Sequence, residues 1–123
     1  MKKYFTQPEL QDLKWVAIDV DGTIAEPSWV PGELNFVVGA PIAENIKKLE
    51  QVVEAGYKIV LYTARPWSHQ QLLEAWCEKH IPQIPIRAII CGKLLFIQLV
   101  DDRAINAMAD SWVPGLVSKP QVG

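Results

Sequence analysis

The stretch WVAIDVDGTIAEP, residues 15–27, changes character at one point, where an apolar run ends in two aspartates separated by a single residue. Residues 15–20 are apolar apart from Asp19, which is typical of a strand covered on both faces in a parallel sheet. Asp19 and Asp21 lie so close together that each makes the ionisation of the other more costly. The stretch therefore predicts a buried strand that ends in a pair of carboxylates.

The residues after this strand predict a loop and then a helix. Prolines and glycines among polar residues over 22–40 indicate a flap loop with room for a small hairpin at most. The helix is expected to have Pro41 in its first turn and to end at Gly56. Its apolar face consists of Ile42, Ile46, Leu49 and Val53.

The second half of the chain continues the alternation of strands and helices. Residues 57–62 predict a second buried strand. Ser68 and Gln71 predict a capping box at the start of the next helix, with Trp67 and Leu72 as its hydrophobic staple. That helix should run to about residue 80 and bury Leu72, Leu73 and Trp76.

Further strands are predicted over 86–90 and 95–100, followed by a helical turn over 103–108 and an extended piece over 112–117. This order favours an α/β fold with a Rossmann-like, doubly wound and mainly parallel sheet flanked by helices.

Length and composition indicate one domain. The chain has 123 residues, of which 50% are hydrophobic, so residues 1–123 fit a single core with an N-terminal extension (1–13) and a C-terminal tail (118–123). A formal net charge of -2 without charge blocks does not indicate nucleic-acid binding. No apolar window approaches the roughly 18 residues of a membrane span. Cys77 and Cys91 form no disulfide framework or zinc motif, so a reducing cytoplasm is the default expectation.

The polar residues of chemical interest follow the predicted strands. Sites in open α/β sheets form outside the carboxyl ends of the strands. The first strand is followed by Asp19 and Asp21, the second by Thr63 and Arg65, and the fourth by Asp101 and Asp102, while Lys93 precedes the fourth.

Four carboxylates at one edge need a counter-charge, because two like charges about 4 Å apart repel by roughly 4 kcal/mol at an effective dielectric of about 20. Oxygen ligands favour Mg²⁺, which also binds substrate phosphates. The expected chemistry is phosphoryl transfer.

Four motifs carry a resemblance to a known family. DVDGT at 19–23, Thr63 in LYTAR, Lys93 in CGK and VDD at 100–102 resemble the motifs of the haloacid dehalogenase-like (HAD) phosphatase superfamily, in the same order. The resemblance spans residues 15 to about 106. It implies a HAD-like core and a Mg²⁺-dependent phosphomonoesterase that acts through an aspartyl-phosphate.

The resemblance also implies a role for each motif residue. Asp19 is expected to be the nucleophile, and Asp21 the general acid and then the general base. Thr63 is expected to hydrogen-bond a phosphate oxygen, and Lys93 to neutralise charge on Asp19 and the transferring group. The backbone N–H groups that follow Asp21 and Thr63, those of Gly22 and Ala64, are expected to complete the phosphate cradle.

The resemblance implies that Mg²⁺ is held by the Asp19 side chain, the Asp21 backbone carbonyl and one acid of the pair after the fourth strand. Asp102 is favoured over Asp101 for this role. Asp101 could instead form a structural ion pair with Arg103.

Other polar and aromatic residues leave alternatives open. Arg65 either reaches substrate or pairs with an acid on the surface. His69 and His80 are expected to be surface residues, and Trp29 could line a substrate entrance.

Two features depart from larger or more typical relatives. The segment after Lys93, LLFIQLV, is almost wholly apolar, whereas many small members have a proline and a polar stretch there. The loops are too short for a cap domain, so the site should be open to a phosphorylated macromolecule, such as a protein, a polysaccharide precursor or a nucleic-acid end, or covered by a second subunit.

An exposed apolar patch at Trp29, Phe36 and Val37 would indicate a homo-oligomer. Two alternatives to a general phosphomonoesterase remain open. They are a polynucleotide-end phosphatase and a non-catalytic module that binds a phosphorylated ligand or a partner.

Overall fold

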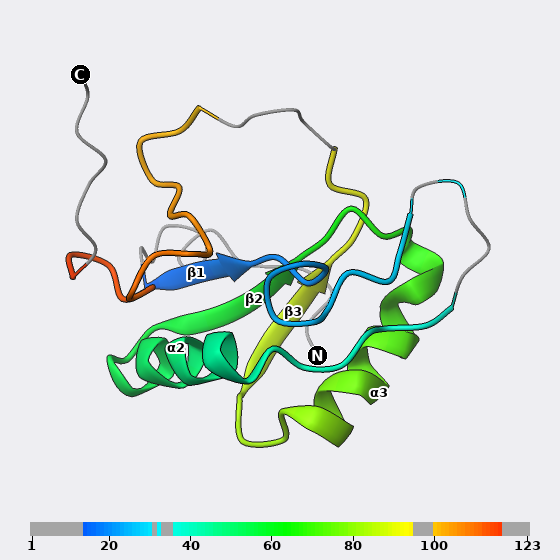
Figure 1. Ribbon diagram of the computed structural model, residues 1–123, viewed down its shortest axis with the longest axis horizontal. Helices are drawn as coiled ribbons and strands as arrows, with labels where there is room; N and C mark the ends of the chain where they lie inside the picture. Colours follow the sequence, from blue (N-terminus) through cyan, green and yellow to red (C-terminus); the bar gives the residue numbers. More distant parts are fainter. Residues whose placement is uncertain (1–13, 31, 33–35, 95–99, 117–123) are drawn as a thin grey trace.

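A three-stranded parallel sheet and two helices form the described part of the protein in a computed structural model, which describes residues 14–30, 32, 36–94 and 100–116 (Figure 1). The strands are β1 (Trp15–Ile18), β2 (Lys58–Tyr62) and β3 (Ile86–Ile90), in the order β1-β2-β3. The helices are α2 (Ala43–Glu54) and α3 (Gln70–His80), and a short 3-10 helix, η1 (Trp67–His69), precedes α3.

The pairing of the strands brings their carboxyl ends together. Ile18 of β1 pairs with Leu61 of β2, and Tyr62 of β2 pairs with Ile90 of β3. The loops after the three strands therefore leave the sheet at one edge. The first three predicted strands are confirmed, although β1 ends at Ile18 rather than at residue 20.

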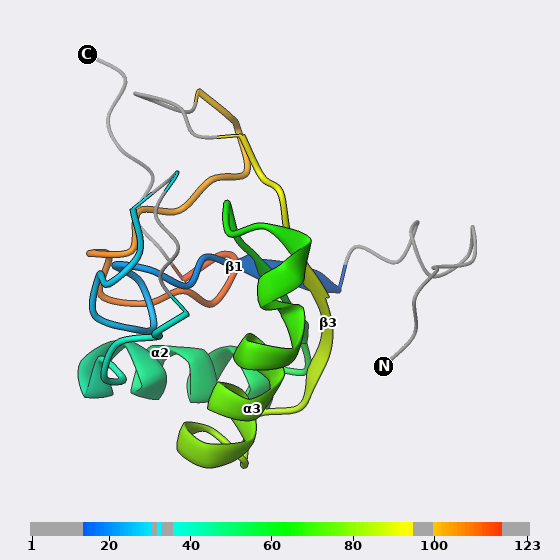
Figure 2. The same cartoon turned by 90° about the vertical axis from the view of Figure 1, so that its right-hand side faces the viewer.

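Both helices lie on the same face of the sheet (Figures 1 and 2). Each connects a strand to its next neighbour in the same direction, and right-handed crossovers then place both helices on one side. The core lies between this face and the helices. Its fully buried members include Leu49 and Val52 of α2, Ile59 and Leu61 of β2, and Leu73 of α3. The expected α/β class with a parallel sheet is confirmed. A doubly wound sheet has helices on both faces, and the described helices lie on one face, so that part of the expectation stays a prediction.

The first predicted helix is close to the observed α2. Ile46 and Leu49 are buried as expected, and Gly56 follows the helix at φ +92°. Pro41 precedes the helix instead of lying in its first turn, because the first helical residue is Ala43.

The predicted capping box at the second helix is wrong. The α3 helix begins at Gln70, and neither η1 nor α3 has a side-chain cap hydrogen bond. The 3-10 turn takes the place of the cap, because the His69 N–H donates to the Pro66 carbonyl at 2.9 Å. Trp67 is 56% exposed and so does not form a buried staple.

The predicted fourth strand lies mostly outside the described residues, which resume at residue 100. Val100 itself is not in a strand and is 90% exposed. Residues 103–108 form turns and irregular backbone rather than a helix, and residues 112–116 form no strand. Trp112 is nevertheless buried, and the Lys48 ammonium of α2 lies 5.9 Å from the centre of its ring. The segment over 100–116 therefore packs onto the domain through Trp112.

No helix within the described ranges has both the length and the apolar character that crossing a membrane requires.

Candidate functional site

A tight turn after β1 positions the two aspartates. The Val20 carbonyl accepts hydrogen bonds from the backbone N–H groups of Thr23, Ile24 and Ala25 at 3.0–3.1 Å. Gly22 adopts φ +80°, a conformation that costs little only for a residue without a Cβ. The Val20 side chain is buried in the core, while the Asp19 side chain keeps 42% of its surface exposed. The turn thus presents Asp19 at the carboxyl edge of the sheet.

Asp19 forms an ion pair with Lys93. The Lys93 ammonium lies 3.3 Å from Asp19 Oδ1, and it lies 5.2 Å from the centre of the Tyr62 ring. The Lys93 backbone N–H donates to the Thr63 carbonyl at 3.0 Å. Three predicted site residues, from the loops after β1, β2 and β3, are therefore brought together at one edge.

Thr63 lies under this edge rather than on its surface. Its side chain is 1% exposed, and Oγ1 accepts a hydrogen bond from the Arg65 backbone N–H at 3.1 Å. A hydroxyl that accepts one hydrogen bond still has its own proton to donate. Ala64, between these two residues, is half-buried.

The Gly22 N–H is already used within the turn. It donates to the Ala25 carbonyl at 2.8 Å. The described structure therefore does not direct this group, expected in the phosphate cradle, towards a ligand.

Arg65 pairs with Asp21 in the interior. The guanidinium Nε lies 2.9 Å from Asp21 Oδ2, and Nη2 lies 2.8 Å from Asp21 Oδ1, so both carboxylate oxygens are bound. Arg65 has no exposed surface. Of the two alternatives for this residue, the structure shows the ion pair, and it places that pair inside the protein rather than on its surface.

The expectation that His69 is a surface residue is wrong. Its side chain is 3% exposed, and Nδ1 lies 3.2 Å from Arg65 Nη1. Burial and the neighbouring Arg65 charge lower the pKa of His69, and the Asp21 charge opposes them only partly. The neutral ring can accept the Arg65 hydrogen bond through Nδ1. In the sequence, the only sign of this contact is that His69 follows Arg65 by four residues. That spacing brings the two side chains together only if residues 65–69 form a turn.

The acidic pair after the undescribed segment is placed differently from the first two aspartates. Asp101 and Asp102 are exposed, and Asp101 Oδ1 accepts a hydrogen bond from the Arg103 backbone N–H at 2.8 Å. Over residues 14–30, 32, 36–94 and 100–116, no three His, Cys, Asp or Glu side chains form a group that could hold a metal. The described structure therefore does not gather the acidic pair with Asp19 and Asp21.

Aromatic and apolar side chains of the flap lie near Arg65. The Trp29 ring centre is 5.9 Å from the Arg65 guanidinium carbon, and the Phe36 ring lies 5.0 Å from that of His69. Phe36 and Val37 are 57% and 59% exposed, whereas Trp29 is half-buried. Trp29 thus packs on the Arg65 guanidinium.

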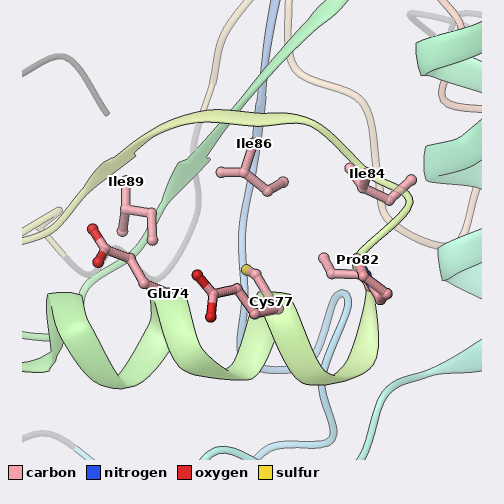
Figure 3. A pocket seen from close by; sticks show the side chains of 8 residues that line it. Glu74, Cys77, Pro82, Ile84, Ile86 and Ile89 are labelled. Atoms are coloured by element: carbon pink, nitrogen blue, oxygen red, sulfur yellow. The ribbon is translucent and has the colours of Figure 1, made fainter.

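A cavity of about 320 Å³ lies away from the predicted site residues, between α3 and β3 (Figure 3). Burial, with smaller contributions from Glu74 and Glu78, raises the pKa of its Cys77 thiol to about 12. A thiol with this pKa is protonated near neutral pH and is a poor nucleophile. The residues that line the cavity are Glu74, Cys77, Glu78, Ile81, Pro82, Ile84, Ile86 and Ile89.

Comparison with known proteins supports the fold alone. A crystal structure of a structural-genomics target from Vibrio cholerae superposes with a TM-score of 0.58 and 24% sequence identity, covering 77% of this chain and 85% of that chain. No family model and no curated protein matches the chain. A shared fold at this identity carries no information about activity.

Proposed function

We propose that the protein hydrolyses phosphomonoesters, with Asp19 as the nucleophile. The observation that carries this proposal is the Asp19–Lys93 ion pair, joined through the Lys93 backbone to Thr63 at the carboxyl edge of the sheet. A half-exposed carboxylate beside an ammonium group suits attack on a phosphoryl group, because the cation offsets repulsion between two anions. The proposal includes the finer fold expected from the sequence, a HAD-like core without a cap domain.

The proposed reaction has two steps. An Asp19 oxygen attacks phosphorus, and the bond from phosphorus to the ester oxygen breaks. The departing alkoxide takes a proton from Asp21, so the Asp21 carboxyl must enter this step protonated, with one of its two hydrogen bonds from Arg65 released. Asp21 then takes a proton from the water that attacks phosphorus, the bond from phosphorus to the Asp19 oxygen breaks, and inorganic phosphate leaves with the Asp19 carboxylate restored. Lys93 offsets the charge on Asp19 and the transferring group in both steps, and the Thr63 hydroxyl supplies a donor for a phosphoryl oxygen.

Mg²⁺ is the cofactor of the proposed reaction, and it would supply a further positive charge beside the phosphoryl group. The Asp19 carboxylate fits this role, since it is partly exposed and provides hard oxygen ligands. The other ligands expected from the sequence are the Asp21 backbone carbonyl and Asp102, with Asp101 as the alternative. Either acid would have to approach Asp19, because the described structure does not gather them with it.

The direct test is hydrolysis of p-nitrophenyl phosphate with Mg²⁺ and with EDTA. We expect turnover that requires the metal, and we expect Asp19→Asn to lower kcat by about three orders of magnitude. The control is Asp110→Asn, because Asp110 is an exposed acid that has no proposed role. Turnover that survives in Asp19→Asn would contradict the proposal.

A binding module is the second candidate. It is favoured because Asp101 and Asp102 are exposed and the described structure does not gather them with Asp19, where catalysis would need a further metal ligand. Such a module would bind a phosphorylated ligand without cleaving it. Beryllofluoride with Mg²⁺ mimics an aspartyl-phosphate, so its effect on Tm separates the candidates. A rise in Tm without turnover of any phosphomonoester, including phosphorylated oligonucleotides, would favour the module.

A further inference from the structure

Arg65 is a buried cation at the meeting point of three segments. Besides the two bonds to Asp21, its Nη2 lies 3.3 Å from Ser28 Oγ and 2.9 Å from the Val37 carbonyl oxygen. Ser28 lies on the outgoing limb of the flap loop and Val37 on the returning limb, and the Ser28 hydroxyl itself donates to the Val37 carbonyl at 3.1 Å. One guanidinium therefore contacts both limbs of the flap and Asp21.

The contacts of Nη2 compete with one another. This nitrogen carries two protons, but three acceptor oxygens lie at 2.8, 2.9 and 3.3 Å. At least one proton must therefore be shared between two acceptors. A shift of either flap limb then changes the strength of the hydrogen bond from Nη2 to Asp21 Oδ1. Because Arg65 is fully buried, a lost partner cannot simply be replaced by bulk water.

The remaining guanidinium contacts restrict how Arg65 can adjust. Nε is bound to Asp21, and Nη1 lies beside His69 Nδ1. The Trp29 ring, also from the outgoing limb, lies near the guanidinium carbon. A planar guanidinium held in this way cannot follow the flap without tilting its bonds to Asp21.

We propose that Arg65 is a positioning residue that couples the described limbs of the flap, residues 22–30 and 36–40, to the orientation of Asp21. A substrate that displaces the flap shifts Arg65, and this shift alters the hydrogen bonds that Arg65 donates to Asp21, the proposed acid–base residue. In its effect on catalysis this inference rests on the proposed function, whereas the coupling itself is a property of the fold and can be measured without turnover.

The first experiment measures amide hydrogen exchange of the flap in the full-length protein. Asp21→Asn keeps the size of the side chain but replaces one carboxylate oxygen by an amide group that cannot accept from Arg65. The guanidinium then loses the bidentate pair that fixes its plane, so its bonds to Ser28 and Val37 should weaken. We expect flap amides to exchange about tenfold faster in Asp21→Asn and at least as fast in Arg65→Lys, while α2 amides are unchanged. The control is Arg87→Lys, because Arg87 is an exposed arginine on β3.

The mutant comparison includes a check for coupling. Ser28→Ala removes the hydroxyl contacts with Arg65 and with the Val37 carbonyl without touching Asp21. The double variant Asp21→Asn with Ser28→Ala should exchange more slowly than the product of the two single effects predicts. Wild-type flap exchange in Asp21→Asn would overturn the coupling. Multiplicative effects in the double variant would also overturn it. If Arg65→Lys does not fold, flap exchange in Asp21→Asn and in the double variant still tests the coupling.

The second experiment measures kinetics with p-nitrophenyl phosphate. We expect Ser28→Ala to lower kcat about threefold with little change in KM, since Asp21 is less firmly oriented. Faster flap exchange with an unchanged kcat, or a change in KM alone, would overturn the positioning role. A wild-type protein without turnover would instead contradict the proposed function, and the exchange measurements would still decide the coupling.

Discussion

His69 illustrates how one residue's surroundings set its protonation. The ring is buried beside the Arg65 guanidinium, and both influences lower its pKa. The neutral form is also the form that can accept the Arg65 hydrogen bond. Protonation of His69 would place two cations side by side in the interior.

The first prediction at this scale concerns stability against acid. In the unfolded chain His69 has a pKa of 6.5, and in the folded chain its pKa is lower. Above pH 6.5 the His69 ring is neutral in both the folded and the unfolded chain. As the pH falls, the ring takes up a proton in the unfolded chain first. The His69 contribution to the free energy of unfolding is therefore present above 6.5 and is lost as the pH falls through the folded pKa.

Urea unfolding at a series of pH values from about 8 to 5 measures this loss. We expect His69→Gln to lose less stability over this range than the wild type. His80→Gln serves as the control, because His80 makes no contact with Arg65 in the described structure. Equal losses in His69→Gln and the wild type would contradict the prediction.

Among the elements, the flap depends on a close approach between its two limbs. The Glu26 N–H donates to the Ala40 carbonyl at 2.8 Å, and the Trp76 indole N–H donates to the Gly39 carbonyl at 2.9 Å. A Cβ at Gly39 would lie 2.3 Å from the Glu26 carbonyl oxygen. The base of the flap therefore requires glycine at position 39.

We expect Gly39→Ala to lower the free energy of unfolding by at least about 2 kcal/mol, because the backbone of one limb must move. The matched control is Gly56→Ala, where φ is +92° and a Cβ meets no atom within 4 Å. That variant has only the conformational cost, about 1 kcal/mol. Chemical denaturation of both variants provides the comparison, and an equal or smaller cost at position 39 would be inconsistent with the close approach.

At the scale of the whole molecule, the segment over 100–116 contributes to the core although it forms no helix or strand. Trp112 is 4% exposed and belongs to the buried apolar cluster, and its indole N–H donates to the Ala107 carbonyl at 3.2 Å. The Lys48 ammonium of α2 reaches the same carbonyl at 3.4 Å. This segment is therefore attached to the domain mainly by Trp112, with Ala107 and Val113 packed beside it.

Trp112→Ala should lower the free energy of unfolding by about 3 kcal/mol, since it removes a buried aromatic side chain. Met108→Ala, at a site that is 84% exposed, should change it by less than about 0.5 kcal/mol. Denaturation curves monitored by circular dichroism separate the two. Similar small effects would show that the segment does not stabilise the domain.

The strands and the face of α2 were predictable because their signals are local. Apolar runs such as residues 59–62 and the spacing of Ile46 and Leu49 predict burial directly. The start of α3 was not predictable in this way. Ser68 and Gln71 satisfy the capping pattern, but the backbone forms a 3-10 turn there, and its hydrogen bond from His69 to Pro66 leaves no distinct sequence pattern.

The sequence by itself determined which residues follow the parallel strands, and so brought Asp19, Thr63 and Lys93 to one edge of the sheet. This follows because alternating strands and helices place consecutive strands side by side and parallel, and that alternation can be read from the apolar runs of the sequence. Only the tertiary structure decided that Arg65 is buried, that it binds Asp21 and both limbs of the flap, and that His69 lies against it. Those contacts join residues up to 44 positions apart, and their geometry depends on how the flap folds back over the sheet edge.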